Sequence, residues 1–302
     1  MKAVKNFLSY VEITTKIASV FPFLIGTGYV LYRYGEINTQ TTLLFFAAMI
    51  LFDLTATAIN NHIGHRQTGR TPHYSNRVSV AIILFMGILG AFLGIMLVSA
   101  TSTTVLFIGI ICFAVGITYS AGPLPIARTP FGEVFSGIVQ GVLIPLIVVE
   151  INRPIFILNF FYPAFENISV QINWVEALYL GITVMPVVLC ISGIMLANNI
   201  CDLQEDISVQ RYTLPFYIGK ERALAVYRLI YAAVYVFVAA AAIAGAVPVF
   251  ALLTLLTAVK VIKNVKDFVR LQDKRQTFFT SILNFLVVLV PYTGFIWLGG
   301  FL

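Results

Sequence analysis

The segment Asn198–Asp206 places three carboxylates and three side-chain amides within nine residues of a chain that is 59% hydrophobic and 11% charged. Asp202 and Asp206 are four residues apart, so on a helix they lie on one face, one turn apart. Two such carboxylates repel each other unless a cation lies between them, and oxygen-only ligation suits Mg²⁺. The alternative is a solvated, acidic helix end at a membrane surface. The predicted metal ligands are Asp202, Asp206, Asn198, Asn199 and Glu205.

Cationic residues elsewhere in the chain could hold an anion beside the metal. Arg211 follows this segment closely, and a guanidinium can donate two parallel hydrogen bonds to an anionic oxygen pair. A second polar stretch, residues 119–133, contains glycines and three prolines, which predict a rigid, non-helical turn. Arg128 lies in this turn, where it can face an anion. Glu133 begins the next apolar run and is interpreted as a cap favoured by the helix dipole.

The elements that must position these residues are apolar helices. The chain has 302 residues and a mean hydropathy of +0.93, and an apolar run of about 20 residues can cross a bilayer as one helix. This predicts an all-α, polytopic membrane protein forming a single domain over residues 1–302. A single long helix in place of the seventh and eighth runs is the alternative, and it would move the C-terminus to the other side. The predicted runs are 13–33, 41–61, 79–98, 103–120, 133–151, 174–198, 222–243, 245–262 and 280–300.

The basic residues give an orientation for this topology. With the N-terminus inside, every Lys and Arg except Arg33 and Arg153 falls on the cytoplasmic side, as the positive-inside rule requires. The net charge of +6 is therefore interpreted as topology and contact with anionic lipid, and not as nucleic-acid binding. We expect a multi-pass protein of the plasma membrane, with its N-terminus and its polar site loops cytoplasmic.

The end of the second run carries a further polar stripe. Asp53, Thr57, Asn60, Asn61 and Gly64 follow a helical spacing. A buried aspartate two turns from the helix end is costly, so it must face a cavity or a partner such as Ser, Thr or Asn on another helix. The second and sixth runs both end in Asn-Asn, which is typical of two halves of one internally repeated site.

Four segments together resemble the UbiA superfamily of intramembrane aromatic prenyltransferases, and most closely its 1,4-dihydroxy-2-naphthoate branch from Gram-positive bacteria. They are residues 11–27 at the first helix, Asn60-Asn61 at the first metal motif, residues 119–137 with Gly-Pro-x-Pro-Ile and Gly-Glu, and residues 198–214 at the second aspartate motif. The resemblance spans most of the chain and implies about nine helices around a central cavity.

The resemblance implies Mg²⁺-dependent transfer of a polyprenyl group from its diphosphate to 1,4-dihydroxy-2-naphthoate or a similar aromatic acceptor, within the bilayer, as a step in menaquinone biosynthesis. Metal ions and cationic side chains stabilise the departing diphosphate, and a dry aromatic cavity protects an allylic cation from water. The implied catalytic residues are Asp202, Asp206, Arg211 and Tyr119. The implied diphosphate-binding residues are Arg128, Arg66, Lys16, Asn60 and Asn61.

One departure from the family pattern leaves the activity open. Asn61 and Gly64 stand where the first motif has acids, and no Asp or Glu occurs between Asp53 and Glu133. Asp202 and Asp206 could carry one metal ion while Arg66, Arg70 or His65 neutralise the other side of the diphosphate; alternatively, Asp53 could reach the cavity. A third alternative is a non-catalytic protein of the same fold that binds a prenyl lipid or quinone. A secondary transporter is disfavoured by the sparse intramembrane charge.

Overall fold

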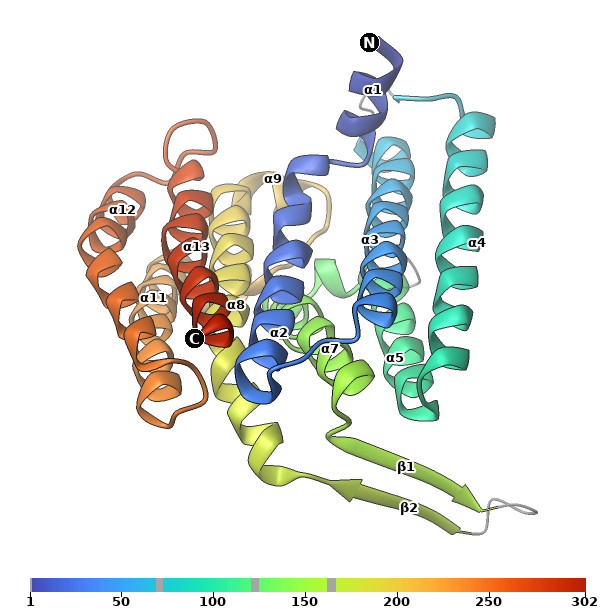
Figure 1. Cartoon of the computed structure of the whole chain (residues 1–302). Coiled ribbons are helices and arrows are strands. Elements are labelled where there is room, and N and C mark those ends of the chain that lie inside the picture. The colour runs from blue at the N-terminus through green and yellow to red at the C-terminus, as the bar shows by residue number, and fades with distance from the viewer. Residues whose placement is uncertain (1, 69–72, 121–124, 162–166) are drawn as a thin grey trace.

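The computed structural model describes residues 2–68, 73–120, 125–161 and 167–302, and in these ranges it leaves out the side chains of residues 2, 65–68, 120, 157–161 and 167–169. Helices dominate and pack side by side as a bundle (Figure 1). The α-helices are α1 (Lys2–Tyr10), α2 (Ile17–Tyr34), α3 (Thr39–Thr68), α4 (Asn76–Ala100), α5 (Thr103–Ser120), α6 (Gly132–Ile138), α7 (Ile144–Asn152), α8 (Trp174–Cys201), α9 (Leu203–Ser208), α10 (Leu214–Ile218), α11 (Lys220–Ile243), α12 (Ala258–Arg270) and α13 (Phe279–Phe301). Short 3₁₀ segments are η1 (Ile13–Lys16), η2 (Ile126–Arg128) and η4 (Val249–Thr257), and η3 (Val139–Leu143) is a π-helix.

The prediction of an all-α, multi-pass membrane protein is confirmed. Within the described residues, seven helices are long and apolar enough to cross a membrane. On α4 the side chains of Phe85, Ile88, Phe92 and Ile95 follow one helical face, and each is more than half exposed. An exposed apolar face of this kind matches contact with lipid.

The predicted count of nine spanning helices is not confirmed, because two runs differ from the others. The fourth forms only a shorter apolar helix, Thr103–Tyr119. The eighth divides into η4 and α12, so it is not one continuous α-helix. The alternative of one long helix through the seventh and eighth runs is wrong: α11 ends at Ile243, and Gly245 adopts a φ of 73° that breaks the helix.

The connection between α7 and α8, about residues 152–173, is rich in aromatic residues, a composition that predicts a short amphipathic helix or an aromatic belt in the plane of the membrane interface. The structure has strands there and no helix among the described residues. The connection forms an antiparallel hairpin of β1 (Phe156–Phe161) and β2 (Asn167–Ile172), in which Phe156 lies opposite Ile172. The hairpin projects from one end of the bundle, far from α1 and α9 (Figure 1). Glu150 on α7 anchors it, since its Oε1 accepts hydrogen bonds from the backbone N–H groups of Ile155 and Phe156, at 2.9 and 2.8 Å.

Two glycines allow α6 and η3 to approach α8 closely. A Cβ added at Gly137 would lie 2.9 Å from the carbonyl oxygen of Val188, and one at Gly141 would lie 2.9 Å from its Cα. Small residues four apart are a common device for close helix packing in membranes. One turn before Gly137, the backbone oxygen of Glu133 accepts a hydrogen bond from the Ser192 hydroxyl on α8, at 3.1 Å. The start of α6 is thereby fixed against the last turns of α8.

We expect Gly141→Ala to destabilise the protein, because the added Cβ meets backbone atoms of Val188 that cannot rotate away. Overpacking of this kind costs about 1–3 kcal/mol. The measurement is the midpoint of thermal unfolding in detergent. Gly181→Ala on α8 is the matched control, since its Cβ would meet no atom within 4 Å. Equal losses in the two variants would contradict the close approach.

Candidate functional site

The polar segments predicted to carry the chemistry gather at one end of the bundle. In Figure 1 this is the upper end, where α1, α9 and the connection between α12 and α13 lie, opposite the β1–β2 hairpin. The turn after α5 docks directly on the chain after α9: the Tyr212 N–H donates to the Arg128 carbonyl at 3.2 Å, and Arg211 Nε donates to the Ala127 carbonyl at 3.1 Å. These contacts thus bring the turn that contains Arg128 together with the chain that follows Asp206.

Glu133 and Asn199 form the buried part of the site. Asn199 Nδ2 donates to Glu133 Oε1 at 2.8 Å, and the two residues are 1% and 3% exposed, respectively. Glu133 lies in the first turn of α6, as the interpretation of a residue favoured by the helix dipole expects. Its side chain also bonds Asn199 on α8, a role beyond that of a helix end. Among the described residues, Glu133 Oε2 is buried without a hydrogen-bond partner.

Arg211 connects this pair to the acidic segment. Its Nη2 donates to Asn199 Oδ1 at 3.3 Å, and its Nη1 lies 3.5 Å from Asp206 Oδ1. Asp206 is buried, and its second oxygen, Oδ2, has no partner among the described residues. Burial raises the pKa of the Asp206 carboxyl; Arg211 opposes the rise, while Asp202 and Glu205 add to it. The site therefore contains two buried carboxylates, and in each of them one oxygen has no hydrogen-bond donor among the described residues.

Asp202 has a different cation. The backbone bond from the Asp206 N–H to the Asp202 carbonyl, at 2.8 Å, confirms that the two aspartates are one helical turn apart. The Asp202 carboxylate, however, pairs with Lys274 from the loop before α13, with Nζ at 2.5 Å from Oδ2. Lys274 also donates to Asn198 Oδ1, and Asn198 Nδ2 donates to Asp202 Oδ2 at 3.2 Å. A lysine thus pairs with one of the two aspartates that were expected to share a metal ion, while Arg211 pairs with the other.

Lys16 and Asp53 form a third polar group, between η1 and α3. Lys16 Nζ lies 2.8 Å from Asp53 Oδ1 and 2.5 Å from Thr57 Oγ1, and the Ser19 hydroxyl donates to Asp53 Oδ2 at 2.6 Å. The expectation that Asp53 needs a partner group is met by a buried lysine. Lys16 would have to give up this ion pair in order to bind a diphosphate.

The remaining predicted residues are less engaged with the site. Asn60 is exposed, whereas Asn61 Nδ2 donates to the Tyr10 carbonyl at 2.8 Å and to Glu12 Oε1 at 3.1 Å. Glu205 is exposed and Arg128 is half-buried. The side chains of Arg66 and His65, and all of Arg70, lie outside the described residues. Asn61 therefore fastens the N-terminal segment to α3.

Tyr119 ends α5 beside the site. The charges of Arg211 and Glu133 both act on its hydroxyl, which is buried. This places a phenol near Arg211 and Glu133.

The described residues do not form a complete metal site by themselves. No group of three or more His, Cys, Asp or Glu side chains in the described ranges is close enough together to hold a metal ion. The donors nevertheless suit Mg²⁺, because Asp206 Oδ2 is buried and available, and Mg²⁺ commonly uses one or two carboxylates together with substrate phosphates.

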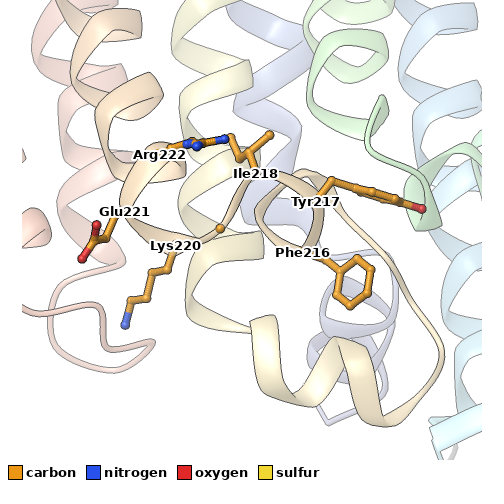
Figure 2. Close-up of a pocket in the computed structure, with 7 residues that line it drawn as sticks. Phe216, Tyr217, Ile218, Lys220, Glu221 and Arg222 are labelled. Atoms are coloured by element: carbon orange, nitrogen blue, oxygen red, sulfur yellow. The ribbon is translucent and has the colours of Figure 1, made fainter.

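An open hollow of about 550 Å³ lies beside the site and is lined by residues 216–222. Figure 2 shows Tyr217 pointing to one side of this hollow, and Lys220 and Glu221 pointing to the other. Its polar groups do not converge, and it contains none of the predicted metal ligands. It is a surface depression at the start of α11 and not the centre of the site.

Sequence reasoning missed two members of the site, Glu133 as a buried acid and Lys274 as the partner of Asp202. The Gly-Glu pair at the end of the polar stretch 119–133 was a usable signal for Glu133, since an acid near an apolar run is costly unless it has a partner or a ligand. Lys274 lies 72 residues from Asp202 and carried no local signal.

Comparison with known proteins places the chain in a family. The profile of the UbiA prenyltransferase family matches residues 19–289, so the chain belongs to that family. A curated relative from Bacillus subtilis (strain 168), 1,4-dihydroxy-2-naphthoate octaprenyltransferase, is 31% identical over 178 residues. That match covers 59% of this chain and 51% of the relative, so it spans about half the length of the relative.

Solved structures share the fold over nearly the whole chain. A UbiA homologue from Aeropyrum pernix K1 has a TM-score of 0.65 at 20% identity, covering 92% of this chain and 97% of its own. A UbiA homologue from Archaeoglobus fulgidus, bound to DMAPP and Mg²⁺, has a TM-score of 0.58 at 12% identity, with 98% of both chains covered. At these identities the likeness shows the fold alone.

We expect Asp53→Ala to lower thermal stability markedly, because it leaves Lys16 buried without its carboxylate. The two side chains are 17% and 6% exposed, and breaking a buried pair by removing one partner costs about 3–5 kcal/mol. A double variant, Lys16→Met with Asp53→Leu, should recover most of the loss, since no unpaired charge remains. Unfolding in detergent measures both, and a double variant no more stable than the single one would contradict a buried ion pair.

Proposed function

We propose that this protein transfers a polyprenyl group from a polyprenyl diphosphate to 1,4-dihydroxy-2-naphthoate, the reaction that gives a precursor of menaquinone. The observation that carries the proposal is the convergence of Glu133, Asn199, Asp206 and Arg211 at one end of a membrane bundle. Carboxylates beside a guanidinium form a site for a cation and an anionic leaving group together. Membership of the UbiA prenyltransferase family supports the reaction class.

In this proposal Arg211 and Lys274 bind the diphosphate. Arg211 is held by the Ala127 carbonyl and by Asn199, so its guanidinium is already oriented before substrate arrives. Lys274 is 44% exposed and lies on a loop, so it can move from Asp202 to a diphosphate oxygen. Arg128 adds positive charge from the neighbouring turn, and we assign Asn60 and Asn61 to the opposite wall.

Asp206 and Asp202 are the proposed ligands of Mg²⁺, with Asn198, Asn199 and Glu205 nearby. Asp206 Oδ2 is buried and has no donor among the described side chains, while Asp202 becomes available once Lys274 leaves it. The ion would supply the positive charge that the departing diphosphate needs. A UbiA homologue of the same fold binds DMAPP and Mg²⁺, which supports this assignment.

The acceptor is assigned by relationship and by the site's surroundings. The Bacillus subtilis relative is named for the naphthoate acceptor and an octaprenyl donor. Tyr119 lies beside Arg211 and Glu133, where a phenol ring can line an acceptor pocket. We further propose that the site end faces the cytoplasm, since the basic residues gather on that side of the predicted topology.

A second candidate function is non-catalytic binding of a prenyl lipid or quinone. Asn61 and Gly64, near the end of α3, stand where the first metal motif of the family has acids. Asn61 is also hydrogen-bonded to Tyr10 and Glu12. These observations favour a site that keeps the fold without the transfer reaction. Binding of a polyprenyl diphosphate without turnover would support this candidate.

The test is turnover by protein purified in detergent or lipid, with a polyprenyl diphosphate, 1,4-dihydroxy-2-naphthoate and either Mg²⁺ or EDTA. Mass spectrometry should detect the prenylated product with Mg²⁺ and none with EDTA. Asp202→Ala and Asp206→Ala should each lower kcat by about 100-fold or more, as expected when charge stabilisation in the transition state is lost. Asp267→Ala, on the exposed face of α12, is the control and should keep full activity.

Full turnover by both site variants would contradict the assignment of the two aspartates. A folded wild-type protein that binds the diphosphate but makes no product with any aromatic acceptor would replace the transferase proposal with the binding function.

A further inference from the structure

Glu133 has the features of a ligand and not of a packing residue. It is 3% exposed, its Oε1 accepts a hydrogen bond from Asn199, and its Oε2 has no partner among the described residues. Leaving a carboxylate oxygen buried without a donor costs free energy. Glu150 Oε2, at the other end of the bundle, is also buried without a described donor, so the oxygen alone does not identify a ligand. The charges of Arg211 and Asp206 both act on this carboxyl, so it belongs to the same electrostatic site.

We propose that Glu133 is a metal ligand of the site, and that Glu133 Oε2 and Asp206 Oδ2 together bind a divalent cation. The proposal rests on the function proposed above and adds a residue to it. The end of α3 offers no carboxylate at Asn61 and Gly64, and Glu133 supplies a second buried carboxylate to the site instead. Two carboxylate oxygens, completed by water or diphosphate oxygens, match the ligation that Mg²⁺ prefers.

Two side chains, Asn199 and Arg211, connect Glu133 to Asp206. Asn199 donates to Glu133 through Nδ2 and accepts from Arg211 through Oδ1, and Arg211 in turn contacts Asp206. Asn199 therefore holds the two carboxylates on either side of one amide and one guanidinium. In each carboxyl group the other oxygen, Glu133 Oε2 or Asp206 Oδ2, is the one without a described partner.

The packing of α6 on α8 maintains this arrangement. Glu133 lies one turn before Gly137, where the helix backbones are closest, and the Ser192 hydroxyl donates to the Glu133 carbonyl at 3.1 Å. A carboxylate fixed on a helix rather than on a loop can be held within the tolerance that metal ligation requires. Asp206, on the short helix α9, completes the pair from the opposite side.

The alternative is a positioning role, in which Glu133 only orients Asn199 by accepting its hydrogen bond. Glu133→Gln separates the two roles, because the glutamine oxygen can still accept from Asn199 while its nitrogen cannot ligate a cation. The matched control is Glu150→Gln. Glu150 is a second buried glutamate, on α7, which bonds the backbone of the β1–β2 hairpin at the other end of the bundle.

The experiment titrates Mn²⁺, as a spectroscopic substitute for Mg²⁺, into the full-length protein in detergent without any prenyl or aromatic substrate. Electron paramagnetic resonance reports free Mn²⁺ and thus the dissociation constant. We expect Glu133→Gln and Asp206→Asn each to weaken binding by about tenfold or more, and Glu150→Gln to leave it unchanged. Thermal unfolding of each variant establishes that it is folded.

Unchanged Mn²⁺ affinity in a folded Glu133→Gln variant would overturn the proposal and leave the positioning role. Absence of Mn²⁺ binding in the wild-type protein would overturn it as well. Because no substrate is present, this result is separate from the turnover test: a protein that binds Mn²⁺ through Glu133 but makes no product retains the metal site and loses only the proposed reaction.

Discussion

The cost of placing charge inside an apolar bundle constrains this structure more than any other factor. A charged group within the membrane region must find a partner, a cavity or a ligand. Lys16 satisfies this constraint with Asp53, and Arg33 does so with Glu176, which also accepts from Tyr29 and Tyr34 at 2.9 Å each. These pairs connect distant helices, so the same contacts that neutralise the charges also fix the packing. Three carboxylates are satisfied only in part: Glu133, Asp206 and Glu150 each retain one buried oxygen without a described donor, and of these Glu133 and Asp206 lie at the site end.

The two ends of the bundle meet this constraint differently. At the hairpin end, Arg33 pairs with Glu176 and Arg153 pairs with Glu36, while the first oxygen of Glu150 is taken by two backbone N–H groups. These contacts hold the helices and the hairpin together at this end. At the site end, the Asp202 carboxylate is neutralised by an exposed lysine that can leave, and the buried carboxylates lie around a single arginine. An ion pair that can open, or a buried carboxylate without full compensation, is useful only where a charged ligand binds.

Sequence patterns predicted what depends on local composition. Hydropathy located the spanning helices, and the spacing of Asp202 and Asp206 placed them one turn apart, as the backbone bond between them confirms. What depends on tertiary contacts could not be predicted. The pairing of Lys274 with Asp202 requires the approach of two loops far apart in the chain, and the contact of Glu133 with Asn199 requires the close packing of α6 on α8. The β1–β2 hairpin was missed because its aromatic residues suit a membrane interface equally well in a helix.

The charges of the site also determine the order in which its ligands can bind. Glu133, Asp202 and Asp206 contribute three negative charges if ionised, against the two positive charges of Arg211 and Lys274 that contact this group. A diphosphate arriving alone would meet two buried carboxylate oxygens without a described partner. A divalent cation would add positive charge beside them, at a depth where electrostatic attraction is little weakened by water. Under the proposed function, the cation would therefore bind before the diphosphate or together with it, and Lys274 would then leave Asp202 for the diphosphate.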